Sequence, residues 1–257
     1  MKKLIVGNWK MNGDAHDAKE LCVSVLDKIE KNEKFVEDCE FLICPPYLHI
    51  ALLLNYLKDR PDILKIGGQD CSAYSNGAHT GDISSSMLKD IGCDYVVLGH
   101  SERRHLVGET NEIISKKVEK AVARGLIVIL CVGETQEQRD ADSAFDVVEQ
   151  QIKEAIFEGI CSDNLIIAYE PVWAIGTGQA ATAGDVMEMH QFIRNKLKEI
   201  VAESSNLRIL YGGSVNADNA AELLNIENVN GALIGGASLD ALSFIEIAKA
   251  ANKTKSE

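Results

Sequence analysis

Short apolar segments alternate with amphipathic segments from one end of the 257-residue chain to the other. The apolar segments are rich in β-branched residues and short enough to be strands, and we expect eight of them, at Leu4–Val6, Phe41–Cys44, Ile63–Ile66, Tyr95–Leu98, Ile127–Val132, Leu165–Tyr169, Arg208–Tyr211 and Gly231–Ile234. A segment with helical periodicity follows each one, at Ala18–Lys31, Leu48–Lys58, Ser84–Ile91, Asn111–Arg124, Ala144–Glu158, Asp185–Ala202, Ala217–Leu224 and Leu239–Ala251. Strands that are separated by helices pair in parallel, through right-handed crossovers.

Eight such units fit a closed barrel better than an open sheet. No Ser/Gly-rich linker or change in composition divides the chain, which contains only four prolines. We therefore predict an α/β fold with a single (β/α)8 barrel domain over residues 1–257 and an active site at the C-terminal ends of the parallel strands. A doubly wound open sheet is the alternative. The barrel is favoured because nearly all the unusual polar residues and glycines follow the carboxyl ends of apolar segments, where barrel enzymes carry their catalytic residues.

The overall charge and hydropathy exclude several classes of protein. A formal net charge of −13 argues against a nucleic-acid partner, which normally requires a basic surface. It does not exclude an anionic substrate, because distant surface charges are screened within about 8 Å while donors in a pocket act at contact. No apolar run approaches the roughly 20 residues that a membrane span needs, and Met1–Leu4 leads into an ordinary strand instead of a signal peptide. We expect a cytoplasmic protein with no membrane partner.

The cysteines indicate neither a disulfide framework nor a metal site. Seven are scattered along the chain, at Cys22, Cys39, Cys44, Cys71, Cys93, Cys131 and Cys161. They form no C-x-x-C pair and have no zinc-binding spacing. Buried free thiols are therefore expected.

A carboxylate and an apolar loop follow the sixth apolar segment. Glu170 comes directly after the strand, and Val172–Ile175 lead into the glycine-bearing run Gly176–Gly178. An exposed loop does not normally carry Trp and Ile, so we interpret this segment as a lid that closes over a ligand. The alternative is that its apolar residues pack on the core and that Glu170 caps a helix.

His100 follows the fourth apolar segment and precedes a Ser/Glu-rich helix start. Amide N–H groups at a helix N-terminus disfavour a charged imidazolium, which leaves a neutral ring that can donate a hydrogen bond. A purely structural histidine is the alternative, and we assign that role to the other five: His16, His49, His79, His105 and His190.

Residues that suit a phosphorylated substrate follow the first strand and the last two. Asn8 and Lys10 alternate along the chain after the first apolar segment, so both side chains can point to the barrel mouth. Glycine turns at Gly212–Ser214 and Gly235–Ser238 end the last two segments, and loops at these places in a barrel commonly bind phosphate through backbone N–H groups. Either turn alone is weak evidence, and a solvated surface lysine is the alternative for Lys10.

Two other functions remain open from the residues alone. Gly176–Ala181 fits G-x-G-x-x-A and Glu199 lies downstream at the distance of a ribose-binding acid, which would suit a nicotinamide dehydrogenase. Against this, the first glycine does not follow the strand in a tight turn, and the motif lies in the sixth unit of the chain. The second alternative is a phosphate-binding barrel without catalysis, which would have no need of Glu170, His100 and Lys10.

Six spaced segments, in order and across nearly the whole chain, resemble the signature segments of the triosephosphate isomerase family: Gly7–Asn12 (GNWKMN), Leu98–Arg104 (LGHSERR), Cys131–Thr135 (CVGET), Ala168–Gly178 (AYEPVWAIGTG), Tyr211–Val215 (YGGSV) and Gly235–Leu239 (GGASL). The resemblance implies an aldose–ketose isomerase that interconverts dihydroxyacetone phosphate and glyceraldehyde 3-phosphate through an enediolate, in glycolysis and gluconeogenesis. It implies no metal and no organic cofactor. The pairing of a glutamate base with a neutral histidine under a closing loop is known from this family and comes with the resemblance.

The resemblance also assigns roles to residues. Glu170 would be the base, His100 the electrophile, and Asn8 and Lys10 would bind substrate. The phosphate would be held by Gly176, Ser214, Gly235 and Gly236, mainly through backbone N–H groups. Supporting residues would be Glu102, Cys131, Glu134, Trp173 and Tyr211, with Glu134 holding Trp173 in the open loop and Tyr211 and Ser214 latching the closed one.

A homodimer is implied in the same way. The loop Gly77–Asp82 would project into a second subunit, so that Thr80 braces the partner's active site and Asp82 pairs with Arg103 of the other chain. The sequence departs from the usual family pattern at Val107, His79 and Gln179–Ala180, which leaves the kinetics of the lid and details of the interface open.

Overall fold

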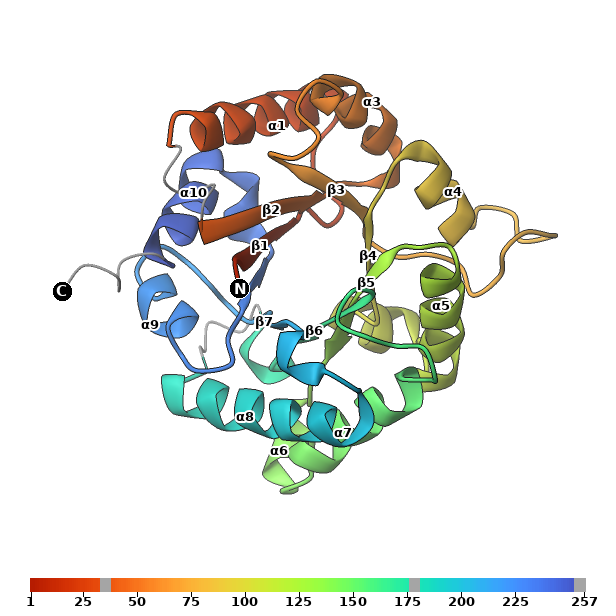
Figure 1. Ribbon diagram of the computed structural model, residues 1–257, viewed down its shortest axis with the longest axis vertical. Helices are drawn as coiled ribbons and strands as arrows, with labels where there is room; N and C mark the ends of the chain where they lie inside the picture. Colours follow the sequence, from red (N-terminus) through yellow and green to blue (C-terminus); the bar gives the residue numbers. More distant parts are fainter. Residues whose placement is uncertain (33–37, 176–180, 252–257) are drawn as a thin grey trace.

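The computed structural model describes residues 1–32, 38–175 and 181–251, and these form a closed barrel of parallel strands inside a ring of helices (Figure 1). The strands follow one another around the barrel in sequence order, and β8 pairs with β1 to close it. Their bounds are β1 Lys3–Asn8, β2 Cys39–Cys44, β3 Lys65–Gly68, β4 Tyr95–Leu98, β5 Ile127–Val132, β6 Leu165–Tyr169, β7 Ile209–Tyr211 and β8 Gly231–Ile234. The predicted fold class is confirmed.

Helices cover the outside of the barrel. The α-helices are α1 Ala15–Glu30, α3 Tyr47–Leu57, α4 Ser85–Ile91, α5 Asn111–Ala123, α6 Gln136–Asp140, α7 Ala144–Ala155, α8 Ala183–Ile200, α9 Ala220–Leu224 and α10 Ala241–Ala250. Short helical turns lie at η1 Arg103–Val107, η2 Val172–Ala174, η3 Ser204–Asn206 and η4 Gly236–Leu239. Helix α6 and the turns η2 and η3 were not expected from the sequence, whereas η1 follows the helix start expected after His100.

Capping side chains explain where several helices begin. Asp14 accepts hydrogen bonds from the amides of His16 and Asp17, so α1 starts three residues before the predicted Ala18. Thr182 and Asp185 form a reciprocal capping box that starts α8 at Ala183. The same device, with Thr135 as the cap, nucleates the unpredicted helix α6.

The third strand lies two residues later than predicted, because packing overrides the low strand propensity of glycine. Strand β3 includes Gly67 and Gly68 instead of Ile63. A Cβ on Gly67 would lie 3.1 Å from both Cys44 Sγ and the Tyr95 Cβ, and one on Gly68 would lie 2.7 Å from Leu88 Cδ1. The barrel wall therefore approaches its neighbours here more closely than a larger residue allows.

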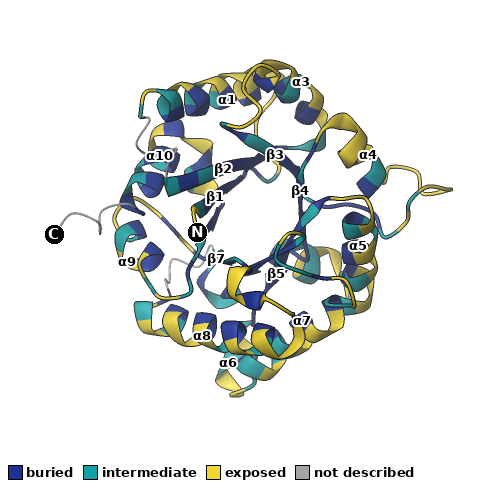
Figure 2. Ribbon diagram, in the orientation of Figure 1, coloured by how far each residue is buried: buried dark blue, intermediate teal, exposed yellow. Residues whose placement is uncertain are grey.

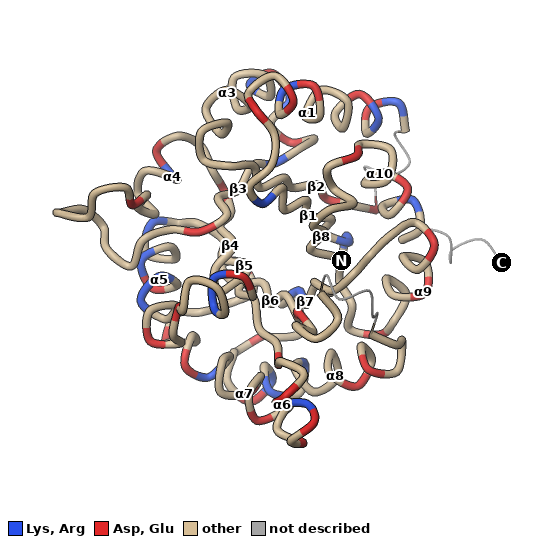
Figure 3. Tube along the Cα trace, turned by 180° about the vertical axis from the view of Figure 1, so that it is seen from behind, with Lys and Arg blue, Asp and Glu red and all other residues tan. Residues whose placement is uncertain are grey.

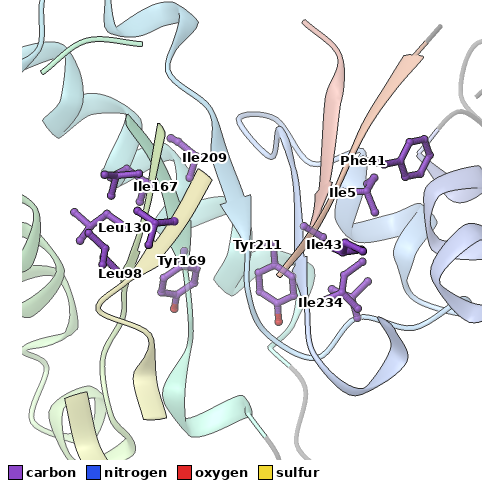
Figure 4. Close-up of a cluster of buried hydrophobic side chains, with 14 of the residues drawn as sticks. Ile5, Phe41, Ile43, Leu98, Leu130, Ile167, Tyr169, Ile209, Tyr211 and Ile234 are labelled. Carbon is purple, nitrogen blue, oxygen red and sulfur yellow. The ribbon is translucent and has the colours of Figure 1, made fainter. Parts of the chain in front are cut away.

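Two apolar clusters form the core. Successive strand residues face opposite sides of the sheet, so Leu4 and Val6 point into the barrel while Ile5 points to the helices. Figure 4 shows part of the outer cluster, in which Ile5, Ile43 and Ile234 come from neighbouring strands. Figure 2 shows the strands and the inner faces of the helices as the buried parts of the molecule, and this packed shell holds the strand ends rigidly.

Charged residues of both signs lie on the outer helices and on the loops between them (Figure 3). Acidic residues outnumber basic ones by 39 to 26 in the whole chain. A search of the described helices finds none that is both long and apolar enough to cross a membrane.

Candidate active site

The C-terminal ends of five strands surround a cavity of about 390 Å³. It is lined by Asn8, Lys10, His100, Glu170, Ile175, Gly212, Gly213, Ser214, Val215, Asn216, Leu233, Gly235, Gly236 and Ala237. The structure thus brings together the residues expected to act as base, electrophile and substrate ligands, which are far apart in the sequence. Gly176 lies outside the described residues.

Glu170 is held by the turn that follows β4. The side chain is 3 % exposed, and its Oε2 accepts a hydrogen bond of 2.8 Å from the Ser101 amide. Its Oε1 lies 3.1 Å from His100 Nε2. The backbone amide of Glu170 donates to Val132 O at 2.8 Å, so the strand end is fixed as well. A carboxylate that is shielded from water and oriented at both oxygens has the geometry expected of a general base.

The hydrogen bonds of His100 define which ring nitrogen can donate. The Glu102 amide donates to His100 Nδ1 at 3.2 Å, so Nδ1 is an acceptor and the hydrogen of a neutral ring is on Nε2. His100 O accepts from the amides of Arg103 and Arg104, which makes the residue the start of a short helical turn. The ring therefore presents an N–H group to the cavity that Glu170 shares.

Lys10 is placed by an unusual backbone conformation. Its φ of 51° lies in the left-handed region, which a non-glycine residue adopts at a cost. The Lys10 amide donates to Asn8 Oδ1 at 3.1 Å, and Lys10 O accepts from Gln69 Nε2 at 2.7 Å. Lys10 Nζ reaches Glu102 Oε1 at 2.6 Å. The cation is thus directed to the mouth of the cavity beside His100.

Gln69 is a site residue that the role assignment missed. Its amide group donates both to Lys10 O and to Cys44 O, which ties the strained residue to the end of β2. The available signal was its position directly after the third strand.

The two glycine turns allow the backbone to approach the side chains of Glu170 and Lys10. A Cβ on Gly212 would lie 2.8 Å from Glu170 Cγ, and one on Gly235 would lie 3.2 Å from Lys10 Cε. Turn η4 begins at Gly236, where the first N–H groups of a helical turn have no partner within it. Donors from the ends of β7 and β8 therefore line the side of the cavity where a phosphate was expected.

The family model of triosephosphate isomerase matches residues 3–251. The chain belongs to the triosephosphate isomerase family. It is accordingly an isomerase. Relatives with that name include proteins from Bradyrhizobium sp. strain ORS 278, 47% identical over 97% of this chain and 98% of its own, and from Aquifex aeolicus, 45% identical over 96% and 98%. The crystal structure of the Bartonella henselae triosephosphate isomerase superposes with a TM-score of 0.88 at 40% identity, covering 97% of this chain and 99% of its own.

The buried carboxylate of Glu134 contacts residues at the start of the segment that the resemblance predicts to be a lid. Glu134 is fully buried, and its Oε1 accepts from Tyr169 Oη at 3.1 Å and from Trp173 Nε1 at 2.8 Å. Arg139 lies 3.2 Å from the same oxygen and stacks on the Trp173 ring at 4.6 Å. The contact between Glu134 and Trp173 is the one expected for an open loop in this family, and Arg139 was not foreseen.

Tyr211 has a hydroxyl without a partner in the part of the chain that the structure describes. This hydroxyl is buried, and burial raises the pKa of Tyr211. The Ser214 side of the expected latch is exposed, and the segment 176–180 that both would hold lies outside the described residues. The latching role stays a prediction.

Cys131 lies against Glu170. Burial first, and the charge of Glu170 second, raise the pKa of this thiol well above its usual value, so it is inert as a nucleophile. Next to it, a Cβ on Gly133 would lie 1.7 Å from Glu170 O, so only glycine fits. Gln151 on α7 pairs with both the N–H and the C=O of Gly133, at 2.7 and 3.0 Å.

The residues expected at a dimer interface lie outside the cavity. Thr80 and Asp82 are exposed on the loop between β3 and α4, which projects from the barrel in Figure 1. Arg103 pairs within its own chain, at 3.0 Å from Asp70 and 2.5 Å from Glu109. Contacts of Asp82 with a second chain remain a prediction. A search of the described residues for three or more clustered metal ligands finds no such group.

Proposed function

We propose that this chain interconverts dihydroxyacetone phosphate and glyceraldehyde 3-phosphate, with Glu170 as the base and His100 as the electrophile. The observation that carries the proposal is the distance of 3.1 Å between Glu170 Oε1 and His100 Nε2 inside a cavity that also contains Lys10. Base and electrophile must act on neighbouring atoms of one small substrate, and a shared buried position allows this.

The proton transfer uses the carboxylate twice. Glu170 removes a proton from one carbon, and the electrons move to the carbonyl oxygen to give an enediolate. That oxygen takes a proton from His100 Nε2, which recovers one from the hydroxyl on the first carbon. The protonated Glu170 then returns its proton to the neighbouring carbon as the new carbonyl forms. Substrate binding exchanges the contact between Glu170 and His100 for contacts with substrate, because Nε2 must donate to a substrate oxygen. The overall reaction transfers no electrons to a cofactor.

Charge on the enediolate oxygens is stabilised by donors that are already in place. His100 Nε2–H and the Asn8 amide group approach the oxygens, and Lys10 offsets the developing negative charge. Ser214, Gly235 and Gly236 line the part of the cavity that suits the phosphate. Donors that are fixed beforehand cost no reorganisation during the reaction.

The test is an assay with glyceraldehyde 3-phosphate in D₂O, followed by mass spectrometry of the product. We expect dihydroxyacetone phosphate that carries deuterium at its carbon 1 in part of the product, because a proton on Glu170 exchanges with solvent. No product would support a binding protein without catalysis, and product formed only with added nicotinamide cofactor would support the dehydrogenase.

We also propose that the protein works as a homodimer in the cytoplasm. Several large apolar residues are exposed, among them Met11 at 95 %, Leu48 at 90 % and Leu106 at 82 %. A second cavity of about 230 Å³ is lined by Met11 and Leu106 together with Lys10 and His100. Apolar exposure of this kind is typical of a protein interface. A loop of the partner subunit placed in this cavity would approach Lys10. The seven free cysteines suit a reducing compartment such as the cytoplasm.

A further inference from the structure

The guanidinium of Arg104 bridges the ends of two neighbouring strands directly behind the catalytic pair. Its Nε donates to Gly99 O at 2.8 Å, and its Nη2 donates to Cys131 O at 3.0 Å. The third nitrogen, Nη1, donates to Asn111 Oδ1 at 2.6 Å. Gly99 immediately precedes His100, and Cys131 lies against Glu170, so each carbonyl is next to one catalytic residue.

The two carbonyls need a side-chain donor because the β4–β5 ladder stops short of them. Regular pairing between the strands ends at Leu98 and Leu130. Gly99 then has a φ of 69° and turns the chain away from the sheet, while Cys131 continues to pair with β6 on its other side. Arg104 therefore supplies the hydrogen bonds that a continued β4–β5 pairing would have made. The turn at Gly99 brings His100 into the mouth of the barrel.

Gly99 and Arg104 depend on each other. A Cβ on Gly99 would lie 2.9 Å from Arg104 Nη2 and 3.2 Å from Cys131 O. Any side chain here would displace the guanidinium in addition to being strained by the positive φ. This turn and this arginine thus form one structural unit.

Ion pairing does not account for Arg104. Among the residues that the structure describes, no carboxylate lies within 4.0 Å of its guanidinium, whereas the adjacent Arg103 pairs with Asp70 and Glu109. Burial lowers the pKa of Arg104, and the negative charge of Glu170 opposes that shift. The planar fork satisfies three neutral acceptors at once, which the ammonium group of a lysine cannot reproduce.

We propose that Arg104 is a positioning residue for the reaction, which fixes the distance between His100 and Glu170 through the carbonyls of Gly99 and Cys131. This inference rests on the proposed roles of His100 and Glu170. A displacement near 1 Å between reacting groups costs on the order of 100-fold in rate. Loss of the fork should therefore affect turnover without removing any contact with the substrate.

The experiment compares Arg104→Lys with the wild type and with Arg60→Lys, a matched substitution in a surface ion pair far from the cavity. We expect the kcat of Arg104→Lys to fall by about 10- to 100-fold while KM changes by less than about 3-fold. Binding of 2-phosphoglycolate, whose carboxylate resembles the charged enediolate, should weaken in parallel with kcat. Binding of inorganic phosphate should not change. Arg60→Lys should behave as the wild type in all four measurements.

Asn111→Ala is a milder second variant, because it keeps the charge and both carbonyl bonds and releases only Nη1. We expect a smaller loss of kcat than for Arg104→Lys, with normal circular dichroism and thermal unfolding. This variant decides the question if Arg104→Lys does not fold.

Two failures can be told apart. An inactive wild type would overturn the proposed function. An active wild type with normal kcat in Arg104→Lys, or in Asn111→Ala where Arg104→Lys does not fold, would overturn the positioning role alone. The positioning role would also be overturned if kcat fell only in proportion to the unfolded fraction, or if kcat and phosphate binding fell together. A general loss of structure predicts both of these results.

Discussion

Glu170 Oε1 lies 3.1 Å from His100 Nε2. The second carboxylate oxygen of Glu170, Oε2, accepts a hydrogen bond of 2.8 Å from the backbone amide of Ser101, the residue that follows His100. One turn of chain therefore orients both oxygens of the Glu170 carboxylate. The carboxylate is held by a ring nitrogen and a backbone amide at the start of a helical turn, and not by a flexible side chain. These contacts limit how far the carboxylate can move before substrate binds.

Shortening the base should reduce turnover far more than substrate binding. Glu170→Asp keeps the charge but withdraws the carboxylate by one methylene, so we expect kcat to fall on the order of 100-fold. KM should change little, because Lys10 and the glycine turns are untouched. Steady-state kinetics in both reaction directions provide the measurement. Near-normal turnover would remove Glu170 from the role of base.

Removal of the electrophile should separate activity from stability. His100→Ala deletes one preorganised donor to the enediolate, which typically costs about 100- to 1000-fold in kcat. We expect the circular dichroism spectrum to remain that of the wild type. His16→Ala, at an exposed position on α1, is the control. If His100→Ala unfolds and loses activity in parallel, His100 is a structural residue.

The strands of the barrel were predictable because their signal is local. Four of the eight strands, among them β5 Ile127–Val132 and β6 Leu165–Tyr169, have the predicted bounds. A continuous β-branched run followed by a polar residue or glycine identifies both the strand and the edge at which it ends. The residues proposed as base and electrophile were singled out by the same logic, aided by the family resemblance.

The contacts of three further residues at the site were not predictable, because their partners are distant backbone atoms. Gln69 binds Lys10 O, Gln151 binds Gly133, and Arg104 binds Cys131 O, over separations of 59, 18 and 27 residues. The hydrophobic periodicity of a sequence carries no information about such long-range contacts. A glutamine on an amphipathic helix looks like an ordinary surface residue until the register of the strands is known.

Charges placed in the exposed apolar patch should shift the protein from dimer to monomer. Leu106 is 82 % exposed and Val107 is 62 % exposed, and both lie at the edge of the cavity that opens toward Lys10. We expect Leu106→Glu and Val107→Glu to lower the mass measured by light scattering, because burying a carboxylate at an interface is unfavourable. Activity per subunit should fall with it.

Leu242→Glu is the matched control for that experiment. Leu242 is 55 % exposed on α10, on the opposite side of the barrel from α4 and α5 (Figure 1). This variant should keep the mass of the wild type. A wild type that is monomeric at micromolar concentration would contradict the proposed homodimer.

His190 should make the protein less stable in mild acid. Burial lowers the pKa of His190 from 6.5 to about 4. Its Nδ1 donates to Asn228 O at 3.2 Å, while the buried Nε2 has no partner among the residues that the structure describes. The unfolded chain binds a proton near pH 6.5 and the folded one only near pH 4, so the unfolded state binds more protons between these values. The contribution of His190 is therefore fully present above pH 6.5 and is lost as the pH falls to about 4. At about 1.4 kcal/mol per pH unit, the loss amounts to about 3 kcal/mol.

The measurement is the free energy of unfolding in urea at pH 7, 5.5 and 4, at one protein concentration because association also contributes. Carboxylates change protonation in the same range, so the wild type is compared with His190→Asn, which keeps a donor for Asn228 O but does not titrate. We expect the variant to be less stable than the wild type at pH 7, because the smaller side chain leaves space beside Tyr169 and Tyr211. Between pH 7 and pH 4, the free energy of unfolding of the wild type should fall by about 3 kcal/mol more than that of His190→Asn. Parallel curves from pH 7 to pH 4 would mean that His190 titrates normally and that its burial has no part in the acid sensitivity of the fold.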